Sequence, residues 1–168
     1  MTDALRIFPS DLEFDAESHV YRFDGVEVPS VTQILKESGL VDDRWYTEQS
    51  AWRGSAIHLA CQYDDEGALD PAYLETEAGP YVRAWRKFKE NLNFQPELVE
   101  HRVFSPTYRY AGTLDRLGTI HGDRLAIVDI KTGAVHATTA IQLAAYQYAL
   151  GRPRICGPVI RVAVKLKP

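Results

Sequence analysis

The sequence has few cysteines, no long apolar run and no excess of basic residues. Its 168 residues include only two cysteines, Cys61 and Cys156. That is too few for the disulfide framework of a secreted protein, or for a four-cysteine metal cluster supplied by this chain alone. No stretch reaches the roughly 18 apolar residues of a membrane span, and the first ten residues lack the pattern of a signal peptide. We therefore expect a cytoplasmic protein.

The charge balance is slightly acidic. Asp and Glu number 23 against 19 Lys and Arg, which gives a formal net charge of −4. This argues against a protein that mainly coats nucleic acid through a basic surface. It does not exclude an enzyme with a local basic groove, because carboxylates that hold a cation count as negative until the metal binds.

The first half of the chain predicts a hairpin and then helices. Two β-rich runs, 19–23 and 26–28, flank Asp24-Gly25, a dipeptide typical of a tight hairpin turn. Ser30 and Gln33 have the spacing of a capping box, which predicts a short helix that ends near residue 39. Further helices are expected over 47–67, from Asp70-Pro71 onward, and over 81–92 after a break at Gly79-Pro80.

The second half predicts mostly strands. An antiparallel meander is expected over 98–104, 110–120 and 125–131, followed by a helix over 138–150 and a strand over 159–166. No internal repeat or interdomain linker interrupts this order. We therefore predict one α+β domain, residues 1–168, with a central mixed β-sheet flanked by helices. Residues 1–46 form its hairpin and helix lead-in, and residues 47–168 its core.

The helix expected over 138–150 has an apolar stripe. Ile141, Ala144, Ala145 and Tyr148 recur at helical spacing, so we expect this stripe to pack on the sheet. Gln142 and Tyr146 would then lie at the rim of the stripe.

Two neighbouring strands carry acidic residues whose register matters. Residues two apart on a strand share a face, so Asp129 and Lys131 point the same way. If the turn at 121–123 pairs Ile120 with Arg124, Asp115 lies opposite Asp129. A slip of one residue would separate the two carboxylates.

Two opposed carboxylates indicate a cation. Like charges directly opposite one another destabilise a sheet unless something neutralises them. All-oxygen ligation by Asp115 and Asp129 suits Mg²⁺ or Mn²⁺. Lys131 would then face an anionic substrate or a water molecule. An Asp-x-Lys pair on its own is more often a solvated surface pair.

Two helices supply residue pairs that strengthen this interpretation. Gly54 and His58 are one helical turn apart, and so are Gln142 and Tyr146. Each pair presents a small or polar face to its surroundings, and Gly54 permits close backbone approach. Taken singly, His58 is more often a satisfied core histidine, and Gln142 with Tyr146 an ordinary amphipathic edge.

In this combination and order, the sequence resembles the RecB-like branch of the PD-(D/E)XK nuclease superfamily, which includes phage-type and CRISPR-associated exonucleases. The pattern is Gly-x-x-x-His, Gly-x-x-Asp, Asp-x-Lys and Gln-x-x-x-Tyr, present here over 54–58, 112–115, 129–131 and 142–146. The segment 28–35 also looks like the lead-in of phage-type members. The resemblance implies a restriction-endonuclease-like core and a bacterial or phage-infected host cytoplasm.

The resemblance also assigns roles to residues. The metal would be held by His58, Asp115, Asp129 and the main-chain carbonyl of Ile130, with Glu100 as a further candidate ligand or as a plain exposed glutamate. Asp115, Asp129, Lys131, Gln142 and Tyr146 would be catalytic. Substrate contacts are expected from Arg53, Thr132, Gln142 and Tyr146.

Aromatic and basic residues interleave just before His58. Arg44-Trp45-Tyr46 and Trp52-Arg53 are candidates to stack on a DNA end, with helix packing as the alternative. Many CRISPR-associated and helicase-linked members bind an iron–sulfur cluster through four cysteines. We expect no iron–sulfur cluster here, and we expect Cys61 to be a small buried residue.

The implied activity is hydrolysis of DNA phosphodiester bonds with Mg²⁺ or Mn²⁺. We expect an exonuclease that acts on DNA ends in recombination, repair or phage DNA metabolism. A structure-selective endonuclease or resolvase is one alternative, and a catalytically silent DNA-end-binding adaptor is another. The acidic charge favours a homo-oligomer or a recombination partner protein that helps to hold DNA. No membrane partner is expected.

Overall fold

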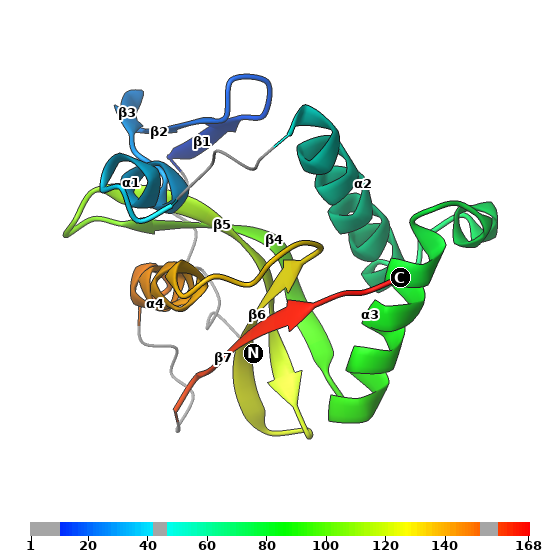
Figure 1. Cartoon of the computed structure of the whole chain (residues 1–168). Coiled ribbons are helices and arrows are strands. Elements are labelled where there is room, and N and C mark those ends of the chain that lie inside the picture. The colour runs from blue at the N-terminus through cyan, green and yellow to red at the C-terminus, as the bar shows by residue number, and fades with distance from the viewer. Residues whose placement is uncertain (1–10, 42–46, 152–157) are drawn as a thin grey trace.

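A mixed four-stranded sheet forms the centre of the protein (Figure 1). A computed structural model describes residues 11–41, 47–151 and 158–168. The strand order is β4-β5-β6-β7, with antiparallel pairing from β4 to β6 and parallel pairing of β7 with β6. The strands span Gln95–Ser105 (β4), Tyr110–Ile120 (β5), Arg124–Lys131 (β6) and Ile160–Lys165 (β7). The predicted α+β fold with a mixed sheet is confirmed.

Helices cover both faces of the sheet. One face packs against α1 (Val31–Glu37) and α4 (Thr138–Ala149), and the other against α2 (Glu48–Asp65) and α3 (Gly79–Leu92) (Figure 1). Within the described ranges, no helix is long and apolar enough to cross a membrane.

Successive side chains of β6 point to opposite faces of the sheet, so this strand contributes to the hydrophobic core on each face. Leu125 and Ile127 pack beneath α4, while Val128 and Ile130 pack beneath α2 and α3. Every one of these side chains is almost fully buried. Because both faces of this strand are buried, its sequence is an apolar run with charged residues only near its ends.

A second sheet lies at the N-terminal side of the protein. It contains β1 (Leu12–Asp15), β2 (Val20–Phe23) and β3 (Val26–Val28), all antiparallel. The predicted hairpin turn is confirmed, because Asp24 and Gly25 have φ values of 52° and 74°. The short strand β1 was not predicted. Phe23 of this sheet stacks on Phe104 of β4 at 4.1 Å between ring centroids, which joins the two sheets.

The helix starts follow the sequence signals. Ser30 caps α1 through the predicted capping box with Gln33, and Thr47 caps α2. The segment after Asp70 differs from the prediction, because it forms only a 3₁₀ turn, η1 (Pro71–Glu75), in place of an α-helix. A β-carbon at Gly79 would clash with the main chain of Leu74, so the glycine lets the chain fold back before α3 begins.

The buried face of α4 also differs from the prediction. Ile141 and Tyr148 of the expected stripe are 48% and 52% exposed, whereas Leu143 and Tyr146 are buried. The physical reason lies in β5. Gly112 leaves a gap in the sheet surface, and the Tyr146 ring fills it so closely that a β-carbon at residue 112 would lie 2.5 Å from Tyr146 Cε1. This contact rotates the helix so that Tyr146 faces the sheet.

Candidate functional site

A break in side-chain alternation creates the site on β4 and β5. Leu114 and Leu117 are three residues apart, yet both pack in the core beneath α4. Between them, Asp115 and Arg116 both reach residues of α2. On the neighbouring strand, Glu100 has a φ of 46° and lies between the pairs Val99–Arg116 and His101–Leu114. A positive φ is uncommon outside glycine and marks a local distortion of the strand.

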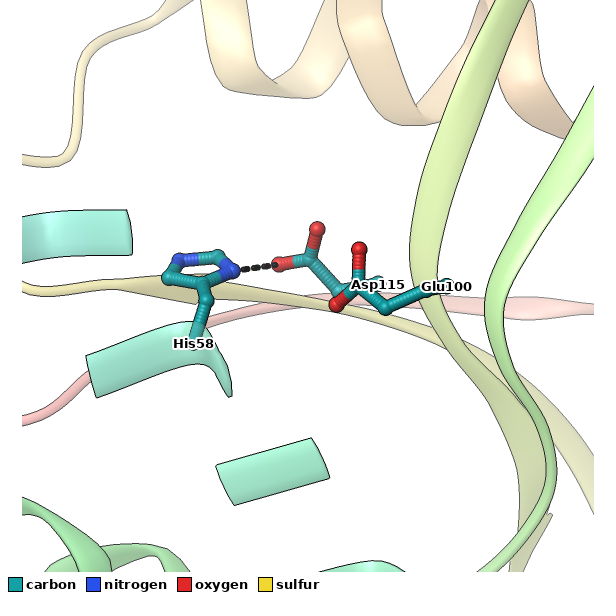
Figure 2. Close-up of side chains that lie close together, drawn as sticks. All are labelled: His58, Glu100 and Asp115. Carbon is teal, nitrogen blue, oxygen red and sulfur yellow. Dashed lines mark ion pairs between the residues drawn. The ribbon is translucent and has the colours of Figure 1, made fainter. Parts of the chain in front are cut away.

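The distortion brings three metal-ligating side chains together. One ligand atom from each of His58, Glu100 and Asp115 lies within 4.8 Å of the others. Figure 2 shows the His58 imidazole directed at Asp115, with the Glu100 carboxylate beside it; His58 Nδ1 and Asp115 Oδ2 are 3.6 Å apart. Burial raises the pKa of Glu100, and the charge of Asp115 raises it further. The three residues come from α2, β4 and β5.

Gly54 and Thr132 lie at the edge of this cluster. A β-carbon at Gly54 would lie 3.5 Å from Thr132 Oγ1, which is ordinary van der Waals contact. The first half of α2 thus lies against the residue that follows β6, one turn before His58. Thr132 is half-buried at this junction.

The register between β5 and β6 places Asp115 beside the Asp-x-Lys strand. Ile120 pairs with Arg124 as predicted, and the paired ladder ends at Arg116 and Val128. Asp115 and Asp129 are the next residues in this register. At this level the main-chain N–H of Ile130 donates a 2.6 Å hydrogen bond to Asp115 Oδ2.

Asp129 forms a buried ion pair with Lys131. Lys131 Nζ donates a 3.0 Å hydrogen bond to Asp129 Oδ1 and lies 2.8 Å from Oδ2. Burial raises the pKa of Asp129 to about 6, and the charge of Asp115 contributes, while Lys131 opposes the shift. Asp129 Oδ2 is buried, so the Lys131 ammonium compensates its charge. The carboxylate is thus adjacent to the three-residue cluster but is held by the lysine.

Hydrogen bonds connect Lys131 to two polar residues of α4. Its ammonium lies 3.5 Å from Gln142 Oε1, and Gln142 Nε2 donates a 2.9 Å hydrogen bond to the Tyr146 hydroxyl. Burial raises the pKa of Tyr146 strongly, so the phenol stays protonated. Lys131, Gln142 and Tyr146, which come from two of the sequence motifs, are therefore connected in space.

Sequence reasoning missed a buried arginine that supports the cluster. Arg116 is 0% exposed. It donates hydrogen bonds to Asp65 at 2.6 Å, to Glu100 at 2.8 Å and to the main-chain carbonyl of Asp115 at 2.6 Å. Asp65 also accepts from Trp85 and Lys89 of α3. The signal in the sequence was an arginine between two leucine-containing halves of the expected strand, next to Asp115.

The remaining residues that the sequence singled out lie in different surroundings. Arg53 is exposed on α2, and its neighbour Trp52 is 74% exposed, so Trp52 does not serve helix packing. Cys61 is buried in the core, where burial raises its thiol pKa to about 12. Arg44, Trp45, Tyr46 and Cys156 lie outside the described residues.

The donor set fits a divalent cation of the hard type. Two carboxylates and one imidazole converge in the cluster, and the Asp129 carboxylate lies next to them. Oxygen-rich sites with a histidine suit Mg²⁺ or Mn²⁺ better than a soft metal. Burial and then the charge of Asp115 raise the pKa of Asp129 and Glu100, and a bound cation would offset the repulsion from Asp115.

Comparison with known protein families shows to which family the chain belongs. The family model described as "PD-(D/E)XK nuclease superfamily" matches residues 60–157, more than half of the chain. The match contains Asp115, Asp129, Lys131 and the Gln142–Tyr146 pair, and it begins just after His58. Comparison with curated proteins finds no match to this chain. The helix-flanked mixed sheet agrees with the core of that family. The chain belongs to the PD-(D/E)XK nuclease superfamily, whose members are nucleases that use divalent metals.

Proposed function

We propose that the protein is an exonuclease that hydrolyses phosphodiester bonds at DNA ends. One observation carries the proposal: an acidic cluster suited to a cation directly adjoins a chain of donors suited to a phosphate. The cluster is His58, Glu100 and Asp115, and the chain runs from Lys131 through Gln142 to Tyr146. Phosphodiester hydrolysis needs both groups, because charge builds on the phosphate while a water molecule attacks.

Each residue has a role in this proposal. His58, Asp115, Glu100, Asp129 and the carbonyl of Ile130 would hold Mg²⁺ or Mn²⁺, which when bound supplies Lewis-acid activation of water and neutralises phosphate charge. Lys131 would hold the attacking water or a non-bridging phosphate oxygen through its ammonium. Because Lys131 also pairs with Asp129, its ammonium has a fixed position before substrate arrives.

Gln142 and Tyr146 would place the phosphate. The Tyr146 ring is fixed by its contact with Gly112, and its hydroxyl in turn orients the Gln142 amide. An amide held in this way can direct one donor or acceptor at a phosphate oxygen without rearranging. Arg53 and Thr132 would contact the DNA backbone nearby. None of these groups reads base edges, so we expect little sequence preference.

The four motifs support the RecB-like branch. The residues of Gly54–His58, Gly112–Asp115, Asp129–Lys131 and Gln142–Tyr146 are far apart in sequence and meet around one site. We infer a single nuclease domain over residues 1–168, with roles in DNA recombination, repair or phage DNA metabolism. A ring or a partner protein would compensate for the acidic net charge of −4 when DNA is held.

One assay tests the proposal. Linear and circular DNA of the same sequence are incubated with the protein and Mg²⁺ or Mn²⁺, with and without EDTA. We expect degradation of linear DNA only, abolished by EDTA. Cleavage of circles would indicate an endonuclease or resolvase, and no cleavage of any DNA would indicate a silent end-binding adaptor.

The assay includes matched variants. Asp115→Asn removes a charge from the cluster, and Asp123→Asn removes one from an exposed turn at the other end of the same strand pair. We expect loss of cleavage in the first variant and parental cleavage in the second. Equal rates in the two variants would contradict the assignment of Asp115.

A further inference from the structure

A pocket adjoins the phosphate-binding side of the site. It lies between α1, α4 and the segment that joins β6 to α4, with a volume of about 530 Å³. Small-molecule sites typically have volumes of roughly 300–1,000 Å³, so the pocket can hold a group the size of one nucleotide. Lys131 and Gln142 form part of its wall. A ligand in the pocket would therefore touch the residues proposed to hold the phosphate.

The lining combines an apolar wall with cationic groups. Leu35, Leu40 and Ala134 supply apolar surface, whereas Lys36 and Lys131 supply positive charge. Among the described residues that line the pocket, none carries a carboxylate. An apolar wall with adjacent ammonium groups matches the two parts of a nucleotide, a flat base and an anionic phosphate. Lys131 also pairs with Asp129, so the pocket borders the acidic side of the site through this lysine.

We propose that this pocket receives one unpaired nucleotide of the DNA strand, next to the phosphate that is cleaved. The inference rests on the proposed nuclease function and adds a substrate class to it. A base that is paired and stacked in a duplex cannot enter a pocket of this size without leaving the helix, which costs unstacking and unpairing free energy. The protein therefore prefers single-stranded DNA or a frayed end over a blunt duplex.

The apolar wall also predicts how the base is held. Leu35, Leu40 and Ala134 can contact the face of any base through van der Waals interactions. Such contacts are insensitive to base identity, in agreement with the low sequence preference expected above. Removing the base while keeping the sugar and phosphate should therefore weaken binding, whichever base is removed.

Two substitutions test the pocket without touching the proposed catalytic residues. Ala134→Trp fills the pocket from an exposed position in a loop, and Lys36→Gln removes a positive charge from the end of α1. Lys87→Gln is the matched control, because Lys87 is exposed on α3 on the other side of the sheet. Circular dichroism and thermal melting establish that each variant is folded.

Binding is measured by fluorescence anisotropy with Ca²⁺ in place of Mg²⁺. The probes are a labelled single strand, a blunt duplex of the same sequence and a single strand with abasic residues at its end. We expect the single strand to bind at least tenfold tighter than the duplex and about fivefold tighter than the abasic strand. Ala134→Trp and Lys36→Gln should each weaken single-strand binding at least fivefold, and Lys87→Gln should bind like the parent.

The outcomes separate the two proposals. Equal binding of single strand and duplex, or parental binding by both folded pocket variants, overturns the pocket inference. Absence of cleavage with Mg²⁺ or Mn²⁺ overturns the nuclease proposal, and pocket-dependent binding of single strands would still support the pocket. Cleavage that both pocket variants slow on single strands, with no change in Lys87→Gln, supports both.

Discussion

Asp115 Oδ2 accepts a 2.6 Å hydrogen bond from the main-chain N–H of Ile130. The bond ties a carboxylate on β5 to the residue between Asp129 and Lys131, at the level where the regular β5–β6 ladder has ended. His58 Nδ1 lies 3.6 Å from the same oxygen. The position of Asp115 is therefore fixed from both the sheet and α2, before a cation binds.

Asp115→Asn should distinguish the effect of the charge of this residue from the effect of its shape, because asparagine keeps the shape and removes the charge. The amide oxygen can still accept the hydrogen bond from Ile130, so we expect the thermal midpoint to change little. The loss of a charged ligand should reduce Mn²⁺ affinity at least about tenfold and cleavage at least about a hundredfold. Calorimetric titration with Mn²⁺ and a gel assay measure the two effects. Parental metal affinity would show that Asp115 is not a ligand.

Asp129→Asn should stabilise the metal-free protein in a pH-dependent way. The pKa of Asp129 is raised from an ordinary 3.8 to about 6 in the folded state, chiefly by burial. Folding therefore favours the protonated carboxyl, and its contribution is lost as the pH rises through about 6. We expect Asp129→Asn to add on the order of 1–3 kcal/mol to the free energy of unfolding at pH 8 and almost nothing near pH 4.

Urea unfolding at both pH values in EDTA measures this difference. The same substitution should abolish cleavage. A stabilisation that is equal at the two pH values would mean that ionisation of Asp129 is not its cause. For the parent, Mn²⁺ affinity should rise between pH 5 and pH 7, because the cation competes with a proton for the carboxylate.

Arg116→Met should affect both stability and metal binding. The substitution leaves Glu100 without its buried cationic partner, and Asp65 keeps its ion pair with Lys89. Breaking a buried ion pair from one side typically costs about 3–5 kcal/mol, and we expect a loss in that range. Mn²⁺ affinity should also fall, because Arg116 orients the Glu100 carboxylate.

A double variant distinguishes charge from packing. Arg116→Met combined with Glu100→Gln also removes the charge of the carboxylate that lost its cationic partner, so it should recover part of the lost free energy of unfolding. It should not recover Mn²⁺ affinity. Equal stability of the single and double variants would show that Glu100 does not depend on Arg116 for its charge compensation.

Tyr146→Phe and Gln142→Ala should slow cleavage without changing Mn²⁺ affinity. The phenylalanine ring keeps the packing against Gly112, so its effect reports the loss of the hydroxyl that binds Gln142. We expect each rate to fall about tenfold, because a misplaced phosphate loses its alignment for attack. Ile141→Ala, on the exposed side of the same helix, is the control. If both variants cleave DNA at the parental rate, Gln142 and Tyr146 have no role in cleavage.

Local signals explain what could be predicted from the sequence. The Asp24-Gly25 turn, the Ser30 capping box and the Ile120–Arg124 register each depend on a few neighbouring residues, and the structure confirms all three. The strand β1 has only four residues and no turn dipeptide to mark it, so it escaped prediction.

Tertiary packing explains what could not be predicted. The buried face of α4 depends on the space above Gly112, which is contributed by another element. The cluster around Glu100 depends on a positive φ in the middle of a strand. The alternation of side chains along a regular strand does not predict such a distortion. Arg116 is buried only because Asp65 and Glu100 reach it from two other elements.

The parallel pairing of β7 with β6 has a practical consequence for protein engineering. The Leu166 N–H donates a 2.8 Å hydrogen bond to the Lys131 carbonyl, so the final strand completes the backbone pairing of the strand that carries Asp129. A truncation before residue 159 would turn β6 into an open edge strand with unpaired N–H and C=O groups. Such an edge pairs with strands of other molecules. We therefore expect the shortened protein to aggregate, and not merely to lose part of its nuclease activity.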